Sequence, residues 1–171
     1  MQSGRSESAI MTSAEQARFR INRPNSRPRA TLVIALDARG AAALAGLKGR
    51  SWNGAKFLRY GEARRASQHL PSLRIDAAVQ DEAGNKLSLI KELAGVDTVI
   101  MLTATDAAEA AEIIGNACAA RGIAVTGLVL APEEGAEALG HIVAVLRPHT
   151  TMLVVSSSED YIGEMLSALR A

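Results

Sequence analysis

The chain alternates between short apolar runs and longer segments in which apolar residues recur at helical spacing. The run 31–36 (TLVIAL) is apolar on both faces of an extended chain, which is typical of a strand buried in a parallel sheet. The segment 105–121 is Ala-rich and amphipathic, and Gly122 follows it as a helix stop. Strands are predicted at 31–36, 55–60, 73–79, 96–103, 123–130 and 150–155. Helices are predicted at 37–47, 62–69, 84–93, 105–121, from 132 or 133 to 146, and at 159–169.

This alternation predicts an α/β fold: a three-layer, mostly parallel, Rossmann-like sheet with helices on both faces. The sheet and its helices occupy residues 31–171, which we expect to form a single domain. A chain of 171 residues is long enough to bury about two-thirds of its unfolded surface without disulfides or bound metals to stabilise it. Residues 1–30 are rich in Ser, Arg, Asn and Pro, and we expect them to form a flexible basic arm.

The amino-acid composition indicates the type of core and the cellular location to expect. Apolar residues make up 48% of the chain but aromatic residues only 3%, so the predicted core is aliphatic. Cys118 is the sole cysteine, which excludes an intramolecular disulfide. The first 30 residues hold no apolar stretch of the kind found in a secretory signal, and no run in the chain approaches the length of a membrane span. We therefore expect a cytoplasmic protein with no membrane partner.

The net charge of the chain is +1, but positive and negative residues are distributed unequally between its two halves. Residues 1–75 hold 14 Lys/Arg and 4 Asp/Glu, a net +10, whereas residues 76–171 hold 5 and 14, a net −9. Such a division permits an acidic partner or self-association that yields a homo-oligomer. It is equally compatible with two sheet edges that differ only in solvated charge.

Ligands of open α/β sheets bind at the carboxyl ends of the strands. The turn after the first strand, 36–42 (LDARGAA), has one glycine where a dinucleotide fingerprint has three. Arg39 offers the one favourable position for a phosphate. Carboxylates predicted in the first turns of later helices would repel it: Asp106, Glu109, Glu133, Glu134, Glu159 and Asp160.

If the carboxyl edge does bind a ligand, the polar groups available are Asp37, Arg39, Asp106 and Ser157. A second possibility is that carboxylates converge there on Mg²⁺, although helix capping accounts for most of them. The carboxylates concerned are Asp37, Asp106, Glu133 and Asp160. No catalytic residue, cofactor or metal site is identified by the sequence. Ser158 is expected to cap the last helix, and Cys118 to be a buried thiol.

Trp52 is the only tryptophan and lies in a basic, glycine-flanked loop. With Arg18, Arg20 and Arg23 of the arm it forms a candidate surface for an acidic protein or a nucleic acid. The alternative is that Trp52 folds back onto the sheet.

Several runs in the second half of the chain form a recognisable series: the strand 95–103 (GVDTVIMLT), the helix end 121–126 (RGIAVT), and the runs 128–132 (LVLAP), 134–139 (EGAEAL) and 151–155 (TMLVV). With these runs, residues 95–156 resemble the nucleotide domain of tubulin and the bacterial division GTPase FtsZ. The resemblance implies that this chain shares the fold of that domain and assembles end to end. Where that family has a glycine-rich phosphate loop this chain has 103–109 (TATDAAE), so GTP hydrolysis and the family's site residues do not carry over.

The sequence favours a non-catalytic binding or assembly module that recognises an acidic partner or itself. The alternative is a small enzyme or ligand sensor with its site at the carboxyl edge. Nucleic-acid binding through the arm and Trp52 is a third hypothesis.

Overall fold

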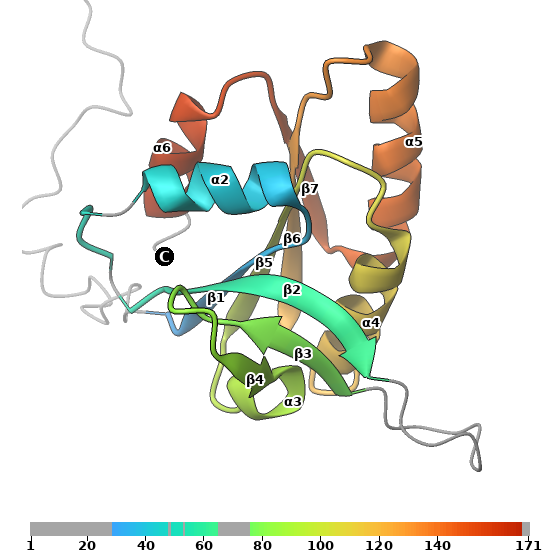
Figure 1. Ribbon diagram of the computed structural model, residues 1–171. Coiled ribbons are helices and arrows are strands. Elements are labelled where there is room, and N and C mark those ends of the chain that lie inside the picture. Colours follow the sequence, from blue (N-terminus) through green and yellow to red (C-terminus); the bar gives the residue numbers. More distant parts are fainter. Residues whose placement is uncertain (1–28, 48, 53, 65–75, 169–171) are drawn as a thin grey trace, which may run out of the picture.

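The computed structural model describes residues 29–47, 49–52, 54–64 and 76–168 (Figure 1). Seven strands form one sheet: β1 (Thr31–Ala35), β2 (Lys56–Arg64), β3 (Asp76–Gln80), β4 (Lys86–Ser88), β5 (Thr98–Thr103), β6 (Ala124–Leu130) and β7 (Met152–Ser156). The helices are α2 (Ala38–Gly46), α3 (Leu89–Glu92), α4 (Ala108–Ala119), α5 (Ala136–Leu146) and α6 (Asp160–Ala168), with a 3₁₀ turn η2 (Arg147–His149).

The strand order is β4-β3-β2-β1-β5-β6-β7. Strands β2, β1, β5, β6 and β7 are parallel; at one side β3 pairs antiparallel with β2, and β4 pairs antiparallel with β3. The predicted α/β class and mostly parallel sheet are therefore confirmed.

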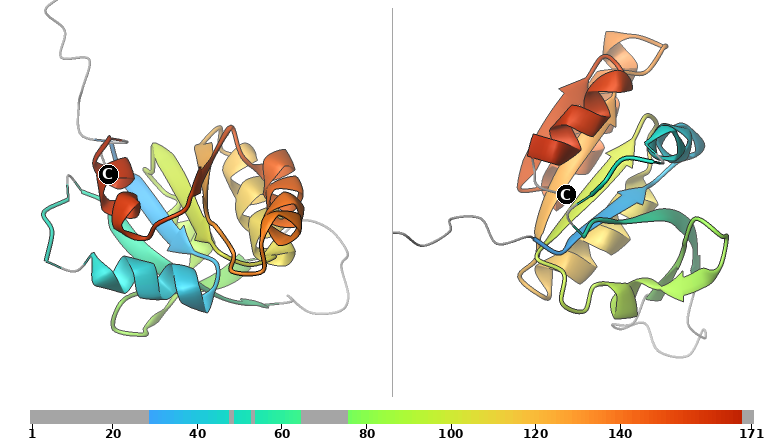
Figure 2. Two further views of the ribbon diagram at one scale, coloured as in Figure 1. Left: turned by 90° about the horizontal axis from the view of Figure 1, so that it is seen from above. Right: turned by 90° about the vertical axis from the view of Figure 1, so that its left-hand side faces the viewer.

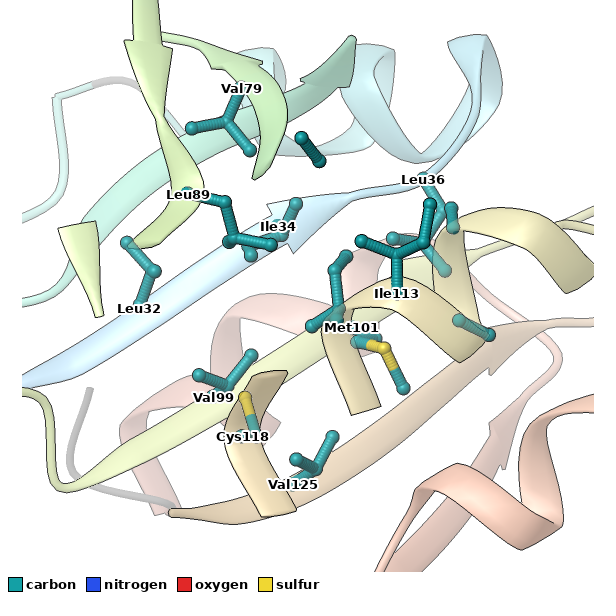
Figure 3. Packing of buried hydrophobic residues seen from close by; sticks show 14 of the residues in the cluster. Leu32, Ile34, Leu36, Val79, Leu89, Val99, Met101, Ile113, Cys118 and Val125 are labelled. Carbon is teal, nitrogen blue, oxygen red and sulfur yellow. The ribbon is translucent and has the colours of Figure 1, made fainter. Parts of the chain in front are cut away.

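Helices cover both faces of the sheet, which gives three layers (Figure 2). In β1, Leu32 and Ile34 belong to the core cluster on the side of α3, α4 and α5, whereas Val33 and Ala35 belong to the cluster on the side of α2 and α6. Both sets are almost completely buried, which explains why the run is apolar on both faces. The α4 face is filled by Leu, Ile, Val and Met side chains, and Cys118 reaches it from α4 (Figure 3).

Two predicted helices are wrong where the structure describes them. Residues 62–64 continue β2 instead of starting a helix, and Gly61 lies so close to the Ala78 carbonyl that a Cβ would be 2.7 Å from its oxygen. The predicted helix 84–93 is a strand followed by one helical turn. Residues 86–88 pair with β3, and the Ser88 hydroxyl then accepts the Lys91 amide at the start of α3. Short mixed segments of this kind fit either period, and pairing with the neighbouring strand β3 decides between them in both cases.

The helix predicted to start at 132 or 133 begins only at Ala136, because Gly135 turns the chain at a φ of 98°. Glu133 and Glu134 are exposed turn residues and not first-turn residues, so that part of the prediction is wrong. The first-turn carboxylate of α5 is Glu137. Glu109 and Asp160 do lie in the first turns of α4 and α6, as predicted. Asp106 and Glu159 were predicted there too, but they precede the two helices, which begin at Ala108 and Asp160.

Candidate functional site at the β1–β5 switch point

Strands β1 and β5 are neighbours whose following helices lie on opposite faces of the sheet. After β1 the chain enters α2 on one face, and after β5 it leads to α4 on the other. Their carboxyl ends therefore form the topological switch point, where ligands of this architecture bind. In this protein a side chain of the protein itself occupies that position.

The Asp37 carboxylate binds five donors at the switch point. Its Oδ1 accepts the amide of Gly40 at 2.6 Å, which caps α2. Its Oδ2 accepts the amides of Ala104 at 2.6 Å and Thr105 at 2.9 Å, beyond the end of β5. The hydroxyls of Thr103 and Thr105 complete the set at 2.8 and 3.0 Å. Backbone amides at a helix start and a strand end are the groups that hold a ligand anion in such folds, and here they hold a carboxylate.

This environment favours the ionised form of Asp37. Partial burial of the carboxyl opposes ionisation, but the hydrogen bonds from Gly40, Ala104, Thr103 and Thr105 outweigh it, so the pKa of Asp37 lies below its usual value. The switch point thus contains a fixed negative charge, which would repel a phosphate or a carboxylate ligand.

Gly40 permits this close arrangement. A Cβ at this position would lie 2.8 Å from the Leu102 carbonyl oxygen and 3.2 Å from Asp37 Oδ1. The single glycine of the 36–42 turn therefore serves the close packing of α2 on β5, which is one of the roles of glycine in dinucleotide-binding turns. The remaining glycines of that fingerprint are absent.

The other three residues predicted to bind a ligand are Arg39, Asp106 and Ser157, and the structure places each of them near the carboxyl edge of the sheet. Arg39 donates to the Glu159 carboxylate at 3.2 Å and to the Ala131 carbonyl at 3.1 Å, and so connects α2 to the ends of β6 and β7. Asp106 contacts His141 Nε2 at 2.8 Å and accepts the Ala108 amide. Ser157 is exposed after β7. Asp37 and Arg39 share one turn, and Asp106 directly follows Thr105, a hydrogen-bond partner of Asp37. Asp37, Arg39 and Asp106 each bind a different set of partners.

The carboxylates proposed for Mg²⁺ are also spread out. Within 29–47, 49–52, 54–64 and 76–168, no three His, Cys, Asp or Glu side chains are grouped so that they could hold a metal ion. The Ser158 hydroxyl accepts the amide of Asp160, the first residue of α6, which agrees with the predicted cap.

An open hollow of about 350 Å³ lies beside the switch point on the α4 side. Leu36, Tyr60 and residues 105–110, which lead into and begin α4, line it, and Asp106 and Glu109 are among them. The Tyr60 hydroxyl oxygen is buried with no hydrogen-bond partner in the described part of the chain. Burial and the nearby Glu109 charge raise the pKa of Tyr60, so its hydroxyl stays protonated at neutral pH.

Trp52 folds back onto the protein, as one of the two alternatives expected. Its ring packs edge-on against Phe57 at 5.5 Å between centroids and joins the core under α2 and α6. The neighbouring Arg50 guanidinium packs over Gly163 of α6, where a Cβ would clash with it. Arg18, Arg20 and Arg23 lie outside the described residues.

The sequence did not reveal Thr103, Thr105, Tyr60 and His141 as members of this region. A weak signal exists for the threonines, because two hydroxyls flank the end of a buried strand at 103 and 105. Nothing local marks Tyr60 or His141, whose neighbours come from distant parts of the chain.

Cys118 is fully buried in α4, and burial raises the pKa of its thiol to about 11. It is therefore not a reactive nucleophile.

No helix among the described residues has both the length and the apolar character needed to cross a membrane. No family model matches the chain, and the comparisons with curated proteins and with solved structures find no match either.

Proposed function

We propose that this chain is a non-catalytic binding or assembly module on a degenerate nucleotide-binding scaffold, which recognises an acidic partner or another copy of itself. The observation that carries the proposal is the Asp37 carboxylate, which takes up the amides and hydroxyls at the β1–β5 switch point. A ligand anion would have to displace a carboxylate held by five donors. From the tubulin/FtsZ resemblance the proposal takes only the fold and the capacity for end-to-end assembly, and not GTP hydrolysis.

The charge layout supports recognition of a macromolecule. Exposed cations of the described N-terminal half include Arg50 and Arg59, whereas Glu133, Glu134 and Asp160 are exposed in the C-terminal half. A basic surface attracts an acidic partner at long range. The arm residues Arg18, Arg20 and Arg23 would extend that surface. A single buried thiol agrees with a cytoplasmic location, which belongs to the proposal.

A second function, a ligand sensor or small enzyme, is favoured by the hollow beside α4. The buried Tyr60 hydroxyl has no partner among the described residues, which is uncommon in proteins, and a catalytic or ligand-binding role is one explanation for such a group. The rim of this hollow is acidic, so its ligand would be cationic or neutral.

A thermal-shift screen separates the two functions. The full chain is tested at low salt against nucleotides, dinucleotides, S-adenosylmethionine, divalent metals and small amines, because any ligand of the native state raises the melting temperature. The proposal predicts no reproducible shift. A shift with one ligand class, lost in Tyr60→Phe but kept in Tyr161→Phe, would establish the ligand site instead.

Recognition of an acidic partner is tested with poly-L-glutamate as the probe and mixed-sequence DNA as a second arm. Replacing Arg18, Arg20 and Arg23 by Ser should weaken binding of poly-L-glutamate at least about tenfold and flatten its salt dependence. A matched variant loses Lys86, Lys91 and Arg121 from the acidic half and should bind as the parent does. Tight binding of DNA alone would favour the nucleic-acid hypothesis.

A further inference from the structure

No further inference is drawn: the strongest candidate, the uncharged edge strand β7 with Met152 and Val155 exposed, carries no proposal because nothing in the structure shows what covers it, and the hollow beside α4 belongs to the site already described.

Discussion

The Asp37 carboxylate accepts a hydrogen bond from the Thr103 hydroxyl at 2.8 Å, across the gap between the ends of β1 and β5. The two residues are 66 positions apart in the chain. Two amides and a second hydroxyl from residues 104 and 105 bind the same carboxylate oxygen. Asp37 therefore caps α2 and at the same time joins the first strand to the loop that leads into α4.

The first prediction concerns acid stability. Because the pKa of Asp37 is lower in the folded protein than in the unfolded chain, its contribution is complete above the unfolded pKa of about 3.9 and is lost as the pH falls through the folded pKa. Asp37→Asn should cost about 2–4 kcal/mol at neutral pH and should flatten the loss of stability below about pH 4. Urea denaturation over a pH series measures both effects.

The control for this series is Asp160→Asn, which removes an exposed first-turn carboxylate at the start of another helix. It should cost less than about 1 kcal/mol. If the free energy of unfolding fell equally steeply at acid pH in the Asp37→Asn variant and in the parent, Asp37 would not titrate as the structure implies.

The second prediction concerns Gly40. Gly40→Ala should destabilise the protein by roughly 1–3 kcal/mol, because its Cβ would press on the Leu102 carbonyl and on Asp37 Oδ1. Gly46→Ala, in the same helix, meets no atom within 4 Å and should stabilise it by up to about 1 kcal/mol. Thermal unfolding of the pair compares the two positions, and similar effects of the two changes would contradict the close packing at Gly40.

The third prediction concerns Cys118. A buried thiol with a pKa of about 11 should not react with a thiol reagent at neutral pH until the protein unfolds. The rate of labelling should therefore follow the unfolded fraction in a urea series. Rapid labelling of the native protein would show that α4 opens locally.

The alternation of apolar runs and amphipathic segments was sufficient to predict the fold class, because a strand buried on both faces, such as β1, needs an apolar residue at nearly every position. It failed at residues 84–93, where three residues join β3 as a strand and four form a helical turn. Both states fit the local pattern, and the hairpin pairing of residues 86–88 with β3 separates them.

The candidate site shows the same limit. The position of Asp37 after the first strand could be inferred from the chain, but its partners at residues 103–105 could not, since their proximity depends on the order of the strands. Arg39 and Glu159 are likewise 120 residues apart. Sequence patterns indicate which groups reach the carboxyl edge, whereas the sheet determines which of them bind one another.

The most direct test of this account is chemical rescue of the switch point. Asp37→Ala removes the internal carboxylate and leaves the amides of Gly40, Ala104 and Thr105 without it. Formate, which is small enough to replace the lost carboxylate, should raise the melting temperature of this variant clearly more than that of the parent, with chloride at equal ionic strength as the control. Equal shifts in the two proteins would contradict the claim that the carboxylate of Asp37 fills an anion site.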